Sequence, residues 1–367
     1  MARKKSCGTY AGSPRSPTYD SRVDFGKPVI TALLHGKSVL VTGGATGIGA
    51  GIVTALAEAG AYVTIADNAG DEGQRFMLEL VNRNLHVQYV YTDVKSFKSQ
   101  TEAFKLANSF HNGLDIVIPC AGSGSGNSIP EWLSATPADA DFPTPIEPPS
   151  TALLDTTATA TYYTTHLAMH YFRRVRLATS PTAGMPFRTS AGDNHSPTST
   201  YSHAHTNSTS TTQTNAAAAH AATHAAACAR QIIFVGSLAA YFTQPLNPAA
   251  QASAFAMRGL WKSMRASPAL VGARTNFVAP TYVRSGKSAA GALETELTSM
   301  GVKMVDVGDV VDAVMRIACD DGIVGRAIAV VAEGNFDICD DPEGFDGGRE
   351  IRRRVQDGPL FGLALLE

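Results

Sequence analysis

The sequence lacks the features that mark a membrane protein or a secreted one. No apolar run reaches the roughly 18 residues that a membrane-spanning helix needs. The first residues, MARKKSCGTY, are basic but have no apolar core of the kind found in a secretory signal. The sequence also lacks an excess of charge of one sign, since the formal net charge of the 367 residues is −2. Such a balanced chain gives no reason to expect nucleic acid or a membrane as a partner, and we expect a cytoplasmic protein.

Cysteine is scarce and is not arranged for cross-linking. The five cysteines show no C-x-x-C spacing, and they are Cys7, Cys120, Cys228, Cys319 and Cys339. Such scattering is typical of a reduced intracellular protein rather than of a disulfide or zinc scaffold. His220 and His224 have a helical i, i+4 spacing, but their alanine-rich stretch contains no carboxylate. We weigh a metal site there and predict none.

Large apolar and basic side chains are missing from one long internal stretch. Between Thr189 and Ala229 there is no Leu, Ile, Val, Phe, Met, Lys or Arg. Such a segment does not bury enough apolar surface to offset the entropy of ordering it. We therefore predict a disordered low-complexity insertion at 179–229. Residues 1–24, rich in Ser, Pro and Gly, predict a disordered tail, with a transit peptide as the alternative, and we expect 341–367 to be a C-terminal extension.

The stretch SVLVTGGATGIGAG, Ser38–Gly51, carries the strongest functional pattern of the chain. An apolar run meets a glycine-rich turn, and an Ala- and Leu-rich helical pattern follows. Glycines let a backbone approach a pyrophosphate closely, and the N-terminus of a helix offers unpaired N–H groups and partial positive charge. Asp67 ends the next apolar run, 62–66, where a ribose-binding acid is expected. The pattern predicts a dinucleotide site.

The order of the expected elements predicts the fold class. Apolar runs predict strands at 38–42, 62–66, 86–91, 114–118, 231–236, 274–279 and 325–332. Helical patterns lie at 48–60, 70–83, 97–110, 152–176, 249–266 and 307–319. Strands that alternate with helices at this spacing indicate an α/β protein with a doubly wound parallel sheet. We expect a single domain at 25–340, in which the Gly-, Pro- and Ser-rich loop 123–150 is either a lid over the site or a plain insertion.

In this order the motifs resemble the short-chain dehydrogenase/reductase family, over 37–178 and 230–340. Thr42-Gly43-x-x-x-Gly47-x-Gly49 resembles the family's T-G-x-x-x-G-x-G turn, and Asp93-Val94 resembles its adenine-contacting Asp. Cys120-Ala121-Gly122 stands where the family has N-A-G, and 276–285 (NFVAPTYVRS) resembles the segment that closes over the nicotinamide. The likeness is closest to the branch that includes prostaglandin-dehydrogenase-like and fungal biosynthetic members, and it implies a Rossmann-type fold.

The resemblance implies which residues contact the cofactor. They are Thr42, Gly43, Thr46, Gly47, Ile48, Gly49, Asp67, Asp93, Val94, Ala121, Gly122 and Pro280. Asp67 favours NAD over NADP, as does Thr46 in place of a basic residue before Gly47, because an acid accepts a hydrogen bond from a ribose 2′-OH and repels a 2′-phosphate. We therefore expect NAD. The resemblance also implies a small-molecule substrate and a homo-oligomer, either a dimer or a tetramer.

The resemblance further implies a catalytic tetrad of Asn, Ser, Tyr and Lys, and most of it is missing. In the family Tyr is the general acid/base and Lys lowers its pKa, while Ser orients the substrate oxygen and Asn supports a water. Ser237, after the strand at 231–236, matches the family's Ser. The Tyr position, 13 residues on, is Ala250, the Lys position four further is Ala254, and the Asn position is Thr157. We predict a degenerate tetrad of which only Ser237 is kept.

Three functions are compatible with an intact cofactor motif beside a depleted catalytic one. The first is an NAD(H)-dependent oxidoreductase acting on an alcohol or ketone of a specialised-metabolite pathway. The second is a redox-dead NAD-binding scaffold or sensor, and the third is a non-redox isomerase or cyclase. The first function needs a substitute proton donor, and the candidates are Tyr241, Tyr162, Tyr163, His166 and His170. For each of them the alternative is a role in packing alone.

Overall fold

The computed structural model describes residues 23–122, 148–179, 230–243, 247–265, 271–284, 294–295, 297–299 and 301–338. Most of the predicted N-terminal tail, insertion, site loop and C-terminal extension lies outside these described residues. Among the residues that are described, no helix is both long enough and apolar enough to cross a lipid bilayer.

The central element of the described chain is a sheet of eight strands in the order β10-β9-β6-β5-β4-β1-β2-β3. The strands are β1 (Ser38–Thr42), β2 (Tyr62–Asp67), β3 (Val87–Tyr91), β4 (Ile116–Pro119), β5 (Gln231–Val235), β6 (Arg274–Pro280), β9 (Ala327–Val331) and β10 (Gly334–Asp337). In this sheet β10 pairs antiparallel with β9, and the other neighbours pair in parallel. The strand order reverses between β1 and β4, where ligands bind in open sheets of this kind. The predicted doubly wound α/β fold is confirmed.

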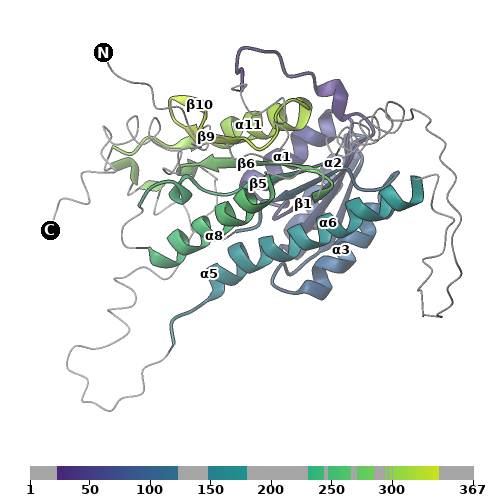
Figure 1. Ribbon diagram of the computed structural model, residues 1–367, viewed down its shortest axis with the longest axis horizontal. Coiled ribbons are helices and arrows are strands. Elements are labelled where there is room, and N and C mark those ends of the chain that lie inside the picture. Colours follow the sequence, from purple (N-terminus) through teal and green to yellow (C-terminus); the bar gives the residue numbers. More distant parts are fainter. Residues whose placement is uncertain are drawn as a thin grey trace, which may run out of the picture.

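Helices cover both faces of the sheet (Figure 1). One face carries α1 (Gly47–Glu58), α2 (Gly70–Asn82) and α11 (Val307–Cys319), and the other carries α3 (Phe97–Phe110), α6 (Ala160–Thr179) and α8 (Pro248–Arg265). Strand side chains alternate between the two faces. Val39 and Val41 lie in the core under α1 and α11, whereas Leu40 lies in the core under α3 and α6. Because both faces are buried there, the strands β1, β4, β5 and β9 are mostly apolar, which is why the sequence pattern locates them.

The elements that the sequence pattern missed are short. The helix predicted at 152–176 is divided into α5 (Ala152–Leu154), a π-helical turn η2 (Asp155–Thr159) and α6. Outside the main sheet, β7 (Val283–Arg284) pairs with β8 (Val305–Asp306). Hydrophobic periodicity needs a longer window than these elements provide. The π-helical turn holds Thr157, and such turns are frequent at functional sites.

The segment before β1 is fastened to the far edge of the sheet. Arg316 in α11 donates hydrogen bonds of 2.9 to 3.1 Å to the backbone carbonyl groups of three residues within 24–27. The N–H of Val23 donates to the Asp337 carboxylate in β10 at 2.7 Å. Residues 23 and 24, which the sequence assigns to the tail 1–24, are thus attached to the domain.

Arg274 in β6 is a buried cation, with 1% of its surface exposed. Its guanidinium donates to the carbonyl oxygens of Ile317 at 2.9 Å, Asp320 at 3.0 Å and Ile323 at 3.1 Å. These carbonyl groups include the C-terminal end of α11, where a helix has unpaired acceptors and partial negative charge. Nearby, burial raises the pKa of the Cys319 thiol to about 11, against the opposing effect of the Arg274 charge. Arg274 therefore fixes the end of α11 to the sheet.

Replacing Arg274 with Met should destabilise the fold strongly. The variant leaves several buried carbonyl groups without a donor, and breaking a buried charged network of this kind costs about 3 kcal/mol. Urea unfolding followed by circular dichroism measures the loss. The control is Lys303→Met, which removes only an exposed ion pair with Glu333 and should cost less than about 0.5 kcal/mol. Equal losses in the two variants would show that the guanidinium does not hold α11.

Candidate functional site

The turn between β1 and α1 packs so tightly that side chains are excluded from it. Gly43 has a φ of +68°, and its N–H donates to the Ala66 carbonyl at 2.8 Å. A Cβ on Gly43 would lie 2.6 Å from Cα of Ala121, and one on Gly49 would lie 2.0 Å from the carbonyl oxygen of Gly43. Thr46, the N-cap residue of α1, makes no side-chain capping bond. The backbone N–H groups of the first turn of α1 therefore remain available to an anion.

Asp67, at the end of β2, fastens this glycine-rich turn to the neighbouring strand. Its side chain is buried, with Oδ2 accepting from the N–H of Ala45 at 2.9 Å and Oδ1 from the N–H of Ala69 at 3.0 Å. Each carboxylate oxygen has a second lone pair for a ligand hydroxyl. The Tyr89 hydroxyl donates to the Asp67 carbonyl at 2.9 Å. Burial and then the Asp67 charge raise the pKa of Tyr89, so that the phenol stays protonated.

The ends of β1 and β4 are tied together beside this turn. Oγ1 of Thr42 accepts hydrogen bonds from the N–H groups of Cys120 at 3.2 Å and Ala121 at 3.4 Å. Gly122 follows, and a Cβ there would lie 3.5 Å from Oγ1 of Thr157 in η2. The chain after β4 therefore passes from the glycine-rich turn to the neighbourhood of the π-helical turn.

The predicted adenine contact, Asp93-Val94, forms the turn after β3. Oδ1 of Asp93 accepts from the N–H of Lys95 at 3.0 Å, and the N–H of Asp93 donates to Oγ of Ser99 at 3.1 Å. Val94 is buried. Because β2 and β3 are parallel neighbours, with Asp67 opposite Tyr91, this turn lies at the same end of the sheet as the Asp67 carboxylate.

Ser237 follows β5 and precedes the short turn η3 (Leu238–Ala240). Its side chain is half-buried, and Oγ accepts from the N–H of Ala239 at 3.1 Å. The hydroxyl can still donate its own hydrogen to a ligand oxygen. Two side chains of α8 hold this turn, since Gln251 donates to the Ala239 carbonyl at 2.6 Å and Arg258 to the next carbonyl at 3.1 Å. The position of the Ser237 hydroxyl therefore depends on α8.

Ala250 and Ala254 lie one turn apart in the same helix, α8. Ala250 is half-buried, and Ala254 is 5% exposed. A methyl group neither ionises nor donates a hydrogen bond. The acid/base and the cation that the family resemblance implies for these two positions are therefore missing from this helix face.

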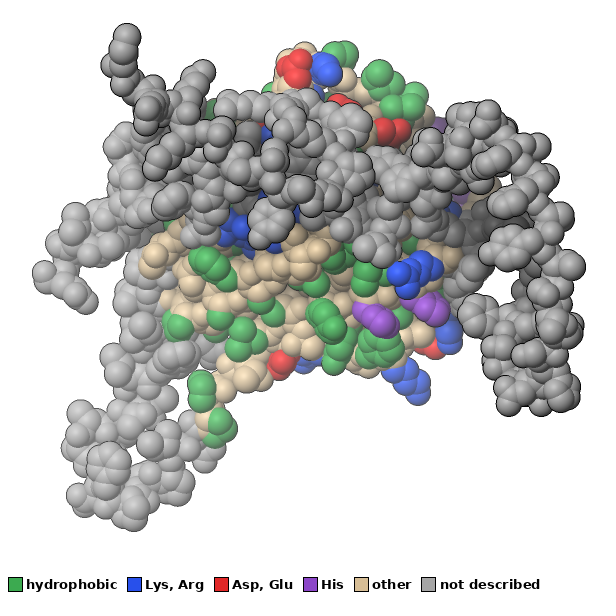
Figure 2. Space-filling view, viewed as in Figure 1, with side chains coloured by type: hydrophobic (Ala, Val, Ile, Leu, Met, Phe, Trp, Pro, Cys, Tyr) green, Lys and Arg blue, Asp and Glu red, His purple; other side chains and the backbone are tan. Residues whose placement is uncertain are grey.

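The candidate substitute proton donors lie in the core beside Phe277 or on α6. Tyr241 is 4% exposed, and its ring packs between the Arg258 guanidinium, 4.1 Å from the ring centre, and the edge of Phe277. On α6, Tyr163 packs edge-on against Phe97. The exposed candidates of α6 are Tyr162, His166 and His170. Figure 2 shows the face to which α6 contributes, where hydrophobic and histidine side chains reach the surface. Within the described residues, the Ser237 hydroxyl is hydrogen-bonded to the backbone N–H of Ala239 and to none of these side chains.

A Tyr-x-x-x-Lys spacing occurs at Tyr91–Lys95, away from Ser237. Tyr91 is the last residue of the edge strand β3, and Lys95 lies in the turn before α3, so the two residues are not on successive turns of a helix. Three strands separate β3 from β5 in the sheet. This pair therefore does not replace the alanines of α8.

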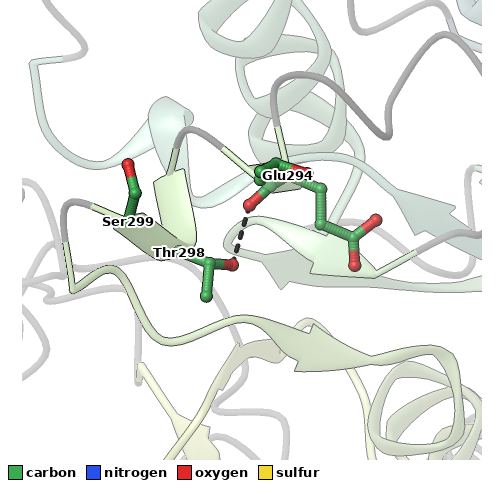
Figure 3. A pocket seen from close by; sticks show the side chains of 4 residues that line it. Glu294, Thr298 and Ser299 are labelled. Carbon is green, nitrogen blue, oxygen red and sulfur yellow. Dashed lines mark hydrogen bonds between the residues drawn. The ribbon is translucent and has the colours of Figure 1, made fainter.

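The chain after β6 borders an open hollow of about 580 Å³ (Figure 3). Pro280, a predicted cofactor contact, is the buried last residue of β6. The residues that line the hollow are Glu294, Thr295, Thr298 and Ser299. Oγ1 of Thr298 donates to the Glu294 carbonyl (dashed line in Figure 3), at a distance of 2.7 Å. The Glu294 carboxylate pairs with Arg284 at 3.0 Å. No predicted site residue lines this hollow, and the described part of the chain contains no group of three His, Cys, Asp or Glu that could hold a metal ion.

Sequence reasoning missed the residues whose side chains support the backbone of the site through hydrogen bonds. Gln251 and Arg258 fix the Ser237 turn, and Tyr89 fixes the end of β2. Their partners are backbone carbonyl groups, which no side-chain pattern reveals. The one available signal was the spacing of Gln251 and Arg258, which are two helical turns apart on α8.

The chain is similar to proteins of one family. A family model described as "short chain dehydrogenase" matches residues 37–173. The chain is 32% identical over 359 residues to "NADP-dependent dehydrogenase M3" of Phoma sp., covering 94% of this chain and 91% of that protein. It is 31% identical over 330 residues to "5′-hydroxyaverantin dehydrogenase" of Dothistroma septosporum, covering 87% of this chain and 92% of that protein.

Solved structures share the fold. The crystal structure of gox2181 aligns with a TM-score of 0.57 at 20% identity, over 83% of this chain and 98% of that chain. A short-chain type dehydrogenase/reductase from Mycobacterium ulcerans aligns with a TM-score of 0.57 at 18% identity, over 89% of this chain and 98% of that chain. The curated relatives, which match at 32% and 31% identity over nearly their full length, show together with the family model that the chain belongs to the short-chain dehydrogenase family.

Proposed function

We propose that this protein is an NAD(H)-dependent oxidoreductase of a specialised-metabolite pathway, acting at a carbon that bears a hydroxyl or a ketone. The observation that carries the proposal is the turn between β1 and α1. Gly43 and Gly49 leave no room for side chains in this turn, and the Asp67 carboxylate accepts a hydrogen bond from its Ala45 N–H. The similar fungal proteins support the reaction class, because both are named dehydrogenases.

The carboxyl ends of the strands would hold the dinucleotide. The first N–H groups of α1 would bind the pyrophosphate, Asp67 the ribose hydroxyls and the Asp93-Val94 turn the adenine. Ala121, Gly122 and Pro280 lie at the ends of β4 and β6, toward the substrate side. When bound, the nicotinamide supplies a hydride donor or acceptor at its C4 atom.

The substrate side would rely on hydroxyl groups rather than on a tyrosine and a lysine. The Ser237 hydroxyl donates to the substrate oxygen and so orients the carbon that gains or loses the hydride. In the reducing direction a proton must also reach that oxygen, and it comes from water or from the substrate itself. The Thr157 hydroxyl, at the Asn position, can hold such a water. Because a missing general acid/base commonly costs 10²- to 10⁴-fold in rate, we expect slow turnover, about a hundredfold or more below that of a complete tetrad.

We also propose a cytoplasmic homo-oligomer that forms through α6 and α8. Tyr162 is 60% exposed and Phe255 is 40% exposed, so both helices present large apolar groups to the surface. Burying such groups against a second copy would lower the free energy of the pair.

The cofactor preference gives the first functional prediction. The protein should bind NADH at least about tenfold more tightly than NADPH, because the 2′-phosphate would meet the Asp67 carboxylate. Asp67→Asn removes that charge and keeps an acceptor, so the ratio of the two dissociation constants should approach one. Fluorescence titration of both cofactors measures the ratio, and Asp71→Asn in the first turn of α2 is the control that should leave it unchanged. Tighter binding of NADPH by the unaltered protein would contradict the assignment of NAD.

Turnover tests the reaction itself. Protein incubated with NAD⁺ or NADH and a panel of secondary alcohols and ketones should show slow formation or loss of NADH absorbance. Ser237→Ala should lower that rate about tenfold or more, because the substrate oxygen loses its donor. Ser263→Ala, an exposed hydroxyl of α8 that donates only to a backbone carbonyl, should leave it unchanged. An equal effect of both substitutions would contradict the role of Ser237.

A second function, redox-dead binding of the dinucleotide as a scaffold or sensor, is favoured by Ala250 and Ala254. An isomerase or cyclase that uses the same pocket is a variant of this view. The double substitution Ala250→Tyr with Ala254→Lys separates these functions. If the parent is inactive and the double variant oxidises alcohols, the parent is redox-dead. If the parent is active and the substitutions lower its rate, then the oxidoreductase proposal stands and the site works without the tyrosine and the lysine.

A further inference from the structure

Gln100 is a buried polar side chain that links separate parts of the site. It lies in α3 and is 0% exposed. Its Nε2 donates to the carbonyl oxygens of Val94 at 2.6 Å and Ala160 at 3.1 Å, and its Oε1 accepts from Oγ1 of Thr164 at 2.7 Å. The helices α3 and α6 lie side by side on one face of the sheet (Figure 1). One amide group therefore joins the turn after β3, α3 and the start of α6.

The partners of Gln100 determine the orientation of its amide. Carbonyl oxygens accept hydrogen bonds and do not donate them, so both of these contacts require the Nε2 hydrogens. The reversed amide would set Oε1 against two carbonyl oxygens, which repel it. An apolar side chain of similar size would leave buried polar groups without this partner, at a cost in stability. The amide is thus a specific link and not a filler of an apolar helix face.

The link connects the two halves of the proposed site. Val94 belongs to the turn that would contact the adenine. Ala160 follows η2 directly, where the π-helical turn gives way to the regular helix α6. The π-helical turn interrupts the regular hydrogen bonding of the helix, and it contains Thr157 beside Gly122. The position of Thr157 therefore depends on what holds the end of η2, and Gln100 is one of the groups that hold it.

We propose that Gln100 is a positioning residue that couples dinucleotide binding to the placement of Thr157. The inference rests on the cofactor site proposed above. A ligand that orders the Asp93-Val94 turn fixes the Val94 carbonyl, which fixes the Gln100 amide, and the amide in turn fixes Ala160 at the end of η2. By linkage, an ordered η2 also favours dinucleotide binding.

Gln100→Met tests the coupling, because Met has a similar length and no hydrogen-bonding amide. The matched control is Thr164→Val, which removes a hydroxyl that lies 2.7 Å from Oε1 of Gln100 and 2.9 Å from the Ala160 carbonyl oxygen, and which leaves both carbonyl contacts of Nε2 in place. In full-length protein titrated with NADH, Gln100→Met should weaken binding about five- to tenfold, and Thr164→Val less than about twofold. Thermal unfolding of both variants shows whether they differ in overall stability.

Hydrogen exchange measures the coupling itself. In the unaltered protein, saturating NADH should slow amide exchange both in the turn at 92–96 and at 155–160, which comprises η2 and the following Ala160. In Gln100→Met most of the NADH-induced protection of η2 should be lost, while the Thr164→Val control keeps it. A general loss of stability would not remove protection from one segment selectively.

The outcomes separate this inference from the proposed function. If the unaltered protein binds neither NADH nor NADPH, the cofactor site and the coupling both fail. If it binds NADH and Gln100→Met has the same affinity and the same protection of η2, the coupling alone is wrong. If both variants lose affinity and protection equally, Gln100 acts only through general packing, which also contradicts the proposal.

Discussion

The close approach of two backbone segments, the turn after β1 and the end of β4, is the constraint on which the rest of the site depends. Gly43 meets Ala121 at a distance that leaves no room for a Cβ, and Gly49 meets the Gly43 carbonyl in the same way. Thr42 adds hydrogen bonds that hold the two strand ends together. With side chains excluded, the N-terminus of α1 opens directly at the point where the strand order reverses.

The proposed dinucleotide side and the proposed substrate side of the site are held in place by different groups. On the dinucleotide side, the Asp67 carboxylate and the Asp93-Val94 turn are held by backbone N–H groups and buried neighbours. On the substrate side, α8 keeps its structural task, since Gln251 and Arg258 still hold the turn after Ser237. The same helix has methyl groups where the family resemblance implies a proton donor and a cation. The helix α8 thus keeps its contacts with the turn after Ser237, while residues 250 and 254 have no side chain that can ionise.

Much of the fold followed from local sequence patterns. The strand predicted at 38–42, the helix at 97–110 and the helix at 307–319 match β1, α3 and α11. Each has apolar residues at the period of its element, and β1 is followed by glycines whose positive φ is a local property. The π-helical turn was missed because a run of β-branched residues inside an apolar helix gives no separate signal.

The long-range hydrogen bonds that support the site and the fold could not be predicted from local sequence patterns. Asp67 was predicted as a ligand group, yet it also binds the N–H of Ala45, 22 residues earlier. Gln100 contacts Ala160, which is 60 residues away in the sequence. Arg274 is a charged residue within a strand that is otherwise apolar or neutral, and its partners are carbonyl groups more than 40 residues further on. Such contacts pair a side chain with a distant backbone group, and the side chain alone does not identify that group.

The measurement that tests the central claim most directly is a crystal structure of the protein grown with saturating NADH. The account predicts the pyrophosphate over the N-terminus of α1 beside Gly43 and Gly49, and the adenosine ribose hydroxyls on the Asp67 carboxylate. It also predicts the nicotinamide between the end of β4 and the Ser237 hydroxyl. A dinucleotide bound elsewhere, or a β1–α1 turn that stays empty at saturating NADH, would contradict the account.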